Sequence, residues 1–125
     1  NKAYFDLEKV ANRDLFFQKN YDNILLDLEQ KGIDPKKKMF LALDEIQLLP
    51  EIASVIKYLY DHYDIKFIAT GSSSYYLKNL FTESLAGRKK IFELFPLDFG
   101  EFLAFNNIPY KAMGYDKMKF SHAEY

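Results

Sequence analysis

Residues 39–45 have the sequence MFLALDE, in which an uninterrupted apolar run leads directly to Asp44 and Glu45. A short apolar run that ends in acidic residues is typical of a central strand of a parallel sheet, buried on both faces. We therefore expect a strand at Met39–Leu43. Its carboxyl end would present two carboxylates at the edge where ligands bind in open α/β sheets.

An Asp-Glu pair at the end of a buried strand has the Walker B pattern. The aspartate, here Asp44, can hold Mg²⁺, usually through waters, because Mg²⁺ gives up its hydration shell reluctantly. The adjacent Glu45 can orient or polarise the water that attacks the γ-phosphate of ATP. The same pattern also fits a strand that simply ends at surface acids.

The rest of the chain alternates between strand-like and helical patterns, which predicts βαβ units and a parallel sheet. The helix after residue 50 has the clearest amphipathic spacing, with apolar residues at helical intervals from Ile52 to Tyr63. Gly32 is the expected stop of the helix before it. The other expected elements are strands at Ala3–Glu8, Lys66–Thr70 and Ile91–Leu97, and helices at Leu15–Gln30, Tyr75–Leu85 and Phe99–Phe105.

A second group of polar residues follows the strand expected at Lys66–Thr70, in the sequence FIATGSSS (residues 67–74). In P-loop ATPases the strand next to the Walker B strand carries a polar residue that senses the γ-phosphate, and Thr70 or Ser72 would serve. The alternative is an ordinary turn in which Ser73 or Ser74 caps the next helix.

Arg88 is the third candidate, because only two arginines occur in the chain and this one follows a glycine in the sequence LAGR. A guanidinium has a fixed charge and suits bidentate contact with phosphate. It could act as an arginine finger on the charge of the transition state. Alternatively, Arg88 is a solvated member of the basic cluster that it forms with Lys89 and Lys90.

Composition limits the classes of protein to consider. The length of 125 residues suits one domain, and a net charge of -1 gives no overall field that attracts nucleic acid or an anionic membrane. The absence of cysteine excludes disulfides and Cys-ligated metals and is compatible with a cytoplasmic location. No apolar run approaches the ~18 residues of a membrane span.

The printed sequence contains no G-x-x-x-x-G-K-[ST] motif, the loop whose amides and lysine cradle the phosphates in P-loop proteins. None of its five glycines begins such a motif. We therefore expect a fragment that carries the Walker B half of a nucleotide site and lacks the Walker A half.

Taken together, the segments FDLE, LALDEIQLLP, FIATGSSS and LAGRKKIFELFPLDFGEFL resemble the prokaryotic AAA-superfamily ATPases that have an uncharacterised C-terminal domain. The resemblance covers roughly residues 3–105. It implies that Asp44 is the Mg²⁺-associated acid, that Glu45 is the catalytic glutamate, and that Thr70 and Ser72 lie at the sensor position. Arg88 falls in the family's L-A-G-R segment, and its role as finger or sensor is our inference.

The resemblance also implies a fold: α/β, P-loop NTPase-like, three-layer α/β/α with a mainly parallel sheet that lacks the P-loop strand. Residues 1–105 would be a partial AAA ATPase core, and residues 106–125 an irregular tail or the start of a linker. In the superfamily's usual strand order, 5-1-4-3-2, the missing strand leaves open edges. We expect the gap to be closed by a shifted Ile91–Leu97 strand or by self-association between chains.

The function that follows is that of a fragment whose full-length parent binds Mg²⁺ and ATP and hydrolyses ATP, while the isolated chain is inactive. The client of such an ATPase, protein or DNA, stays open, and no membrane partner is expected. Two alternatives belong to other classes. One is a non-catalytic interaction module with a degenerate ATPase fold, and the other is a small nucleic-acid-binding domain that uses Lys89 and Lys90.

Overall fold

A computed structural model describes residues 1–72 and 87–109 of the chain. The chain divides into two compact units, Asn1–Ile91 and Phe92–Tyr125, which we describe separately. The helix expected at Tyr75–Leu85 lies outside the described residues, as does most of the tail. The expected domain boundary at residue 105 stays a prediction.

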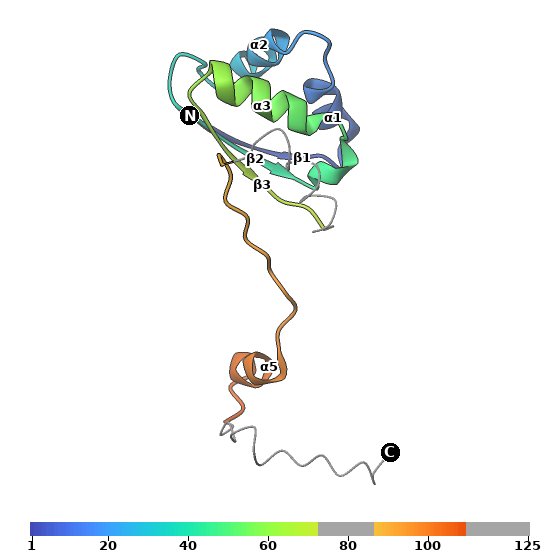
Figure 1. Ribbon diagram of the computed structural model, residues 1–125, viewed down its shortest axis with the longest axis vertical. Coiled ribbons are helices and arrows are strands. Elements are labelled where there is room, and N and C mark those ends of the chain that lie inside the picture. Colours follow the sequence, from blue (N-terminus) through green and yellow to red (C-terminus); the bar gives the residue numbers. More distant parts are fainter. Residues whose placement is uncertain (73–86, 110–125) are drawn as a thin grey trace. The chain divides into compact units, whose positions relative to one another are not determined.

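The first unit contains a three-stranded parallel sheet in the order β1-β2-β3 (Figure 1). The strands are β1 (Lys2–Asp6), β2 (Met39–Asp44) and β3 (Ile65–Ala69). Helices occupy both connections, as parallel pairing requires. The parallel α/β prediction is therefore confirmed, and the order agrees with strands two to four of the superfamily order.

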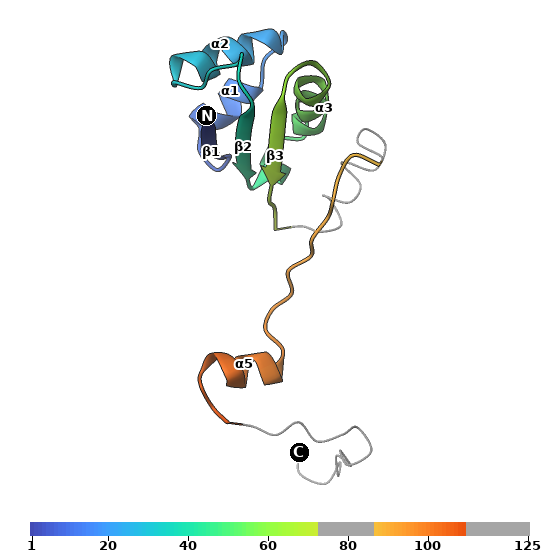
Figure 2. The same cartoon turned by 90° about the vertical axis from the view of Figure 1, so that its left-hand side faces the viewer.

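Three helices cover one face of this sheet: α1 (Val10–Phe16), α2 (Asp22–Gln30) and α3 (Ile52–His62) (Figures 1 and 2). A short 3₁₀ turn, η1 (Ile46–Leu48), leads from β2 toward α3. Between the helices and the sheet lies one apolar core, to which α3 contributes Ile52, Val55, Ile56 and Leu59 of the predicted stripe, whereas Tyr60 of that stripe is exposed. Its most completely buried side chains are those of Leu7, Phe16, Ile24, Leu28, Met39, Leu41, Leu43, Ile46, Ile52, Val55 and Leu59.

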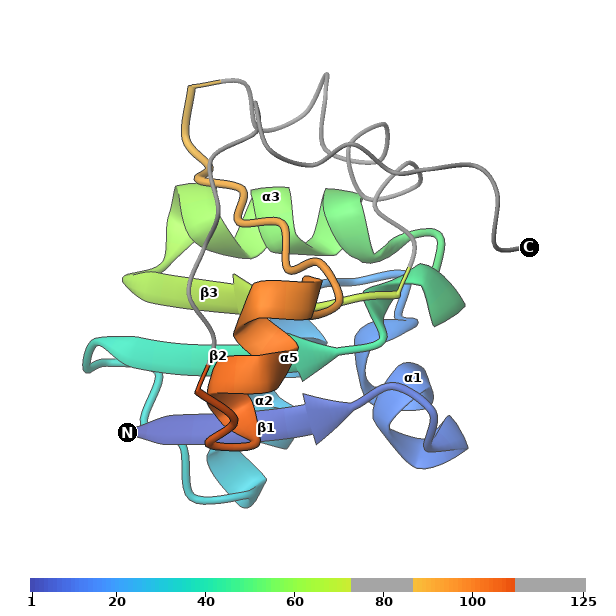
Figure 3. The ribbon, with the colours of Figure 1, turned by 90° about the horizontal axis from the view of Figure 1, so that it is seen from below.

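Within the described residues of the first unit, α1, α2 and α3 lie on the same side of the sheet, and no helix of this unit covers the opposite face (Figure 3). Along β2, Met39, Leu41 and Leu43 are buried, whereas the intervening Phe40 is 44% exposed. On the neighbouring strands Tyr4 and Ile68 are also exposed. The prediction that β2 is buried on both faces is thus wrong within the first unit, whose described residues form one helical layer on one sheet.

The prediction of a single helix at Leu15–Gln30 is also wrong, because the chain forms two helices there and the first begins at Val10. The break follows Phe16. Asn20 then accepts a hydrogen bond from the backbone N–H of Asp22 (3.0 Å), a local turn that competes with a continuous helix. The predicted stop is confirmed: Gly32 has φ +85°, and the N–H of Ile33 reaches back to Leu28 O.

The strand expected at Ile91–Leu97 is not formed, and these residues have no regular structure. A strand needs a neighbour to pair with, and Pro96 removes one backbone donor. The helix expected at Phe99–Phe105 is confirmed as α5. A capping box starts it: Asp98 accepts from the Glu101 N–H (2.8 Å), and Glu101 accepts from the Asp98 N–H (3.0 Å).

Candidate functional site

The carboxyl ends of the strands bring together three polar side chains from three segments. Asp44 ends β2, Thr70 directly follows β3, and Tyr4 lies within β1. Residues two apart in a strand share a face, and the register pairs Tyr4 with Ala42 and Ala42 with Ile68. Tyr4, Asp44 and Thr70 therefore belong to the open face rather than the helix-covered one.

The backbone fixes the tips of β2 and β3 to each other. The N–H of Thr70 donates to Leu43 O (2.9 Å), and the N–H of Ile46 donates to Thr70 O (3.1 Å). The predicted Walker B and sensor positions are thus joined by main-chain hydrogen bonds on both sides of Asp44. Their side chains are therefore held side by side.

Among the described residues, three groups donate hydrogen bonds to the Asp44 carboxylate. Tyr4 donates its hydroxyl to Oδ2 (2.6 Å), Thr70 donates its hydroxyl to Oδ1, and the Glu45 N–H donates to Oδ1 (3.1 Å). These bonds, led by that of Thr70 and then that of Tyr4, lower the pKa of Asp44 below its usual value despite some desolvation. Donating to Asp44 in turn raises the pKa of Tyr4 to about 12. The site at neutral pH is therefore a carboxylate held by neutral hydroxyls.

Glu45 leaves the sheet with a left-handed backbone, at φ 54° and ψ 44°. This conformation is uncommon for a residue with a side chain. The Glu45 carboxylate accepts a hydrogen bond from Gln47 Nε2, and the same nitrogen donates to Ser72 Oγ (2.9 Å). The predicted catalytic glutamate and one predicted sensor are thus linked through Gln47. The Oε1 atom of Gln47 is buried and has no partner among the described residues.

Arg88 is not brought to this group. Its guanidinium pairs with Asp61, in the last turn of α3. Because α3 leads from the carboxyl end of β2 back to the amino end of β3, Asp61 lies near the amino ends of the strands, whereas Asp44 lies at their carboxyl ends. The other arginine, Arg13, donates to Leu7 O (2.5 Å) and Glu8 O (2.9 Å) after β1. The role of Arg88 as a finger or sensor stays a prediction.

The donor set fits Mg²⁺, which prefers oxygen ligands and is commonly held by one or two carboxylates together with substrate phosphates. Asp44 would hold the ion, with the hydroxyls of Thr70 and Ser72 nearby in the same set of loops. Within residues 1–72 and 87–109, no group of three or more acidic, His or Cys side chains forms a closed metal cage.

Two residues of the site, Tyr4 and Gln47, were not predicted from the sequence. Strand alternation could have placed Tyr4 on the face of Asp44, had the register of β1 on β2 been known. No sequence pattern marked Gln47, because its contact with Ser72 depends on the path of η1.

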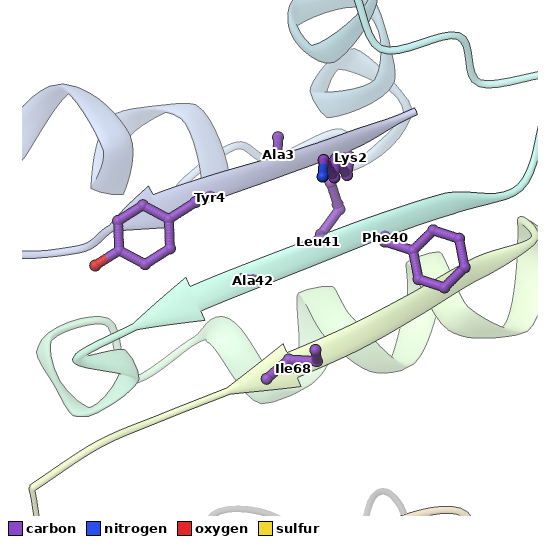
Figure 4. A pocket seen from close by; sticks show the side chains of 7 residues that line it. All are labelled: Lys2, Ala3, Tyr4, Phe40, Leu41, Ala42 and Ile68. Carbon is purple, nitrogen blue, oxygen red and sulfur yellow. The ribbon is translucent and has the colours of Figure 1, made fainter.

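Tyr4 also borders a hollow of 410 Å³ on the open face, lined mainly by apolar side chains such as Phe40 and Ile68 (Figure 4).

A parallel sheet with helical crossovers, whose middle strand ends in Asp-Glu beside a threonine, defines an α/β protein of the P-loop NTPase-like class. The sequence comparison narrows this class. A family model described as "AAA domain" matches residues 1–103, and the chain belongs to this AAA-type, ATPase-like family.

Among curated proteins, the chain is 24% identical over 98 residues to an uncharacterized protein of Haemophilus influenzae. The match covers 78% of the chain and 24% of that relative, so the chain spans about a quarter of the relative's length. No solved structure matches the chain. In the part of the chain that the structure describes, every helix is too short or too polar to cross a membrane.

Proposed function

We propose that this chain supplies the Mg²⁺-holding and water-activating half of an ATP-hydrolysing site. The observation that carries the proposal is the Asp44 carboxylate, which is held by Tyr4 and Thr70 at the carboxyl edge of the sheet. Membership of the AAA-type family supports a nucleotide as the ligand. The proposed location is the cytoplasm.

In this proposal each side chain has one task. Asp44 holds the hydrated Mg²⁺, which when bound neutralises the charge that develops on the β- and γ-phosphates. Glu45 accepts a hydrogen bond from the attacking water and orients it. Thr70 and Ser72 present hydroxyls toward the terminal phosphate. Thr70 donates a hydrogen bond to Asp44, and Ser72 is linked to Glu45 through Gln47.

The proposal requires a phosphate-binding loop from elsewhere, because the 125 residues contain no G-x-x-x-x-G-K-[ST] motif. Such a loop would come from a longer polypeptide or from another chain. The matching share of the Haemophilus influenzae relative supports a longer polypeptide. ATP hydrolysis is accordingly proposed for the protein that contains both halves.

The test is the Mg²⁺ dependence of ATP hydrolysis by a polypeptide that contains this chain and a phosphate-binding loop. Asp44→Asn keeps the size of the side chain and removes its charge. We expect it to abolish the Mg²⁺-dependent rate, whereas Asp14→Asn, on the exposed surface of α1, leaves that rate unchanged. An Asp44→Asn protein with the original Mg²⁺ dependence would refute the proposed role.

We also propose self-association through the open edges of the sheet. In the described residues β1 and β3 each have one unpaired edge, which is a template for pairing with another chain. A finger role for Arg88 would fit such an assembly, since its own Asp44 lies at the other end of the strands. Analytical ultracentrifugation tests this proposal, and a monomer at all concentrations would refute it.

A further inference from the structure

We propose that Tyr4 is a positioning residue for the metal-holding aspartate: its hydroxyl fixes Asp44 Oδ2 so that a second lone pair of this oxygen is offered to the hydrated Mg²⁺. The inference rests on the proposed function. The inference adds a residue of β1 to the site, whereas the site residues predicted from the sequence on the sheet lie at the ends of β2 and β3.

The sheet register makes the contact possible. Tyr4 lies opposite Ala42, two residues before Asp44 and on the same face. Such diagonal neighbours are within reach of a long aromatic side chain. The methyl group of Ala42 leaves the space above β2 open, and the hydroxyl of Tyr4 points toward the carboxyl ends of the strands (Figure 4).

Counting acceptor positions shows what the tyrosine does. A carboxylate has about four lone-pair sites, two on each oxygen. Among the described residues, Oδ1 of Asp44 accepts from Thr70 and from the Glu45 N–H, whereas Oδ2 accepts from Tyr4 alone. The direction of the second position on Oδ2 is set by the bond from Tyr4.

Without that bond the carboxylate would be held on one oxygen only. The torsion that turns an aspartate carboxyl group is broad and roughly two-fold, so a single restraint leaves it free to swing. Tyr4 contributes little to the core, because 63% of it is exposed. Its hydroxyl is thus placed to orient Asp44 rather than to hold the fold together.

The experiment compares Tyr4→Phe with Tyr60→Phe, an exposed tyrosine on α3, in the polypeptide that carries the phosphate-binding loop. A net hydrogen bond is worth roughly 2- to 12-fold in an equilibrium constant. We expect Tyr4→Phe to raise the half-saturating Mg²⁺ concentration by about 3- to 10-fold. The KM for ATP at saturating Mg²⁺ should change by less than about 2-fold, and Tyr60→Phe should alter neither quantity.

A second measurement does not depend on activity. In a Glu45→Gln background, which is expected to bind ATP without hydrolysing it, Mn²⁺ binding in the presence of ATP is followed by electron paramagnetic resonance. Adding Tyr4→Phe should weaken Mn²⁺ binding by a similar factor, with the melting temperature within a few degrees of the parent. Unchanged Mn²⁺ affinity would overturn the inference.

The two proposals fail in different ways. If Asp44→Asn shifts the Mg²⁺ dependence and Tyr4→Phe does not, the role of Tyr4 is refuted while the proposed function stands. If Asp44→Asn itself leaves the Mg²⁺ dependence unchanged, the proposed function is refuted and the inference falls with it.

Discussion

The two faces of the sheet are built from the same three strands, and they differ in burial and in polar contacts. The covered face consists of side chains such as Phe5, Leu41 and Leu43, which are buried under the helices. The open face carries Tyr4, Asp44 and neighbouring residues that contact one another by hydrogen bonds. Alternate residues of one strand thus serve stability and candidate chemistry, so mutations should separate the two.

The largest expected effect is on the covered face. Leu41 is 1% exposed at the centre of the sheet, so Leu41→Ala should lower the free energy of unfolding by about 2–5 kcal/mol. The adjacent Phe40, on the open face, is the matched control, and Phe40→Ala should cost less than half as much. Urea unfolding measures both. Equal losses would show that the open face is as well packed as the covered one.

The next largest effect is expected from breaking the link that Gln47 makes between Glu45 and Ser72. Gln47→Met keeps the length of the side chain and removes the amide that donates to both residues. Misplacing a catalytic group by about 1 Å can cost up to about 100-fold in rate. We expect kcat for ATP hydrolysis to fall by roughly 10-fold, with the affinity for ATP unchanged. A parallel loss of affinity would instead indicate a damaged nucleotide site.

A smaller effect concerns the helical side, where another carboxylate is held by two hydroxyls. Tyr58 and Tyr63 both donate to Asp22 Oδ1, at 3.0 and 2.8 Å, and tie α3 to α2. These bonds raise the pKa of both tyrosines, so their stabilising effect is complete below the unfolded-state pKa of about 10. It is lost as the pH rises from there through the folded-state values. Denaturant unfolding from pH 8 to 11 should show this decline, and Asp22→Asn should reduce it.

The smallest expected effect is that of the pair between Arg88 and Asp61. Both side chains are partly exposed, at 44% and 32%, so solvent screens their attraction. A double-mutant cycle with Arg88→Ala and Asp61→Ala should give a coupling of about 0.2–1 kcal/mol. A finger role would have a different signature, since losing such an arginine costs about 10³-fold or more in hydrolysis. Measuring both quantities on Arg88→Ala separates the two roles.

The sequence predicted those parts of the structure that depend on local pattern. The apolar run before Asp44 gave β2, and the stripe from Ile52 gave α3, because burial periodicity identifies strands and amphipathic helices. The placement of Asp44 beside Thr70 followed from parallel strands ending at one edge.

Contacts set by register or by the path of a loop could not be predicted. Tyr4 reaches Asp44 only because β1 pairs with β2 in one register, and Gln47 reaches Ser72 only because η1 turns back. The strand expected at Ile91–Leu97 failed for a related reason, since a pattern of apolar residues forms a strand only beside a partner strand. The pairing of Arg88 with Asp61 likewise depends on tertiary structure.

The central claim, that the open face carries the hydrolytic half of a nucleotide site, is tested most directly on Glu45→Gln. The measurement compares ATP binding and ATP hydrolysis in the polypeptide that contains the phosphate-binding loop, with the exposed Glu29→Gln on α2 as control. We predict that Glu45→Gln binds Mg²⁺-ATP as the parent does and hydrolyses it at least about 100-fold more slowly. Hydrolysis at the parent's rate would contradict the account.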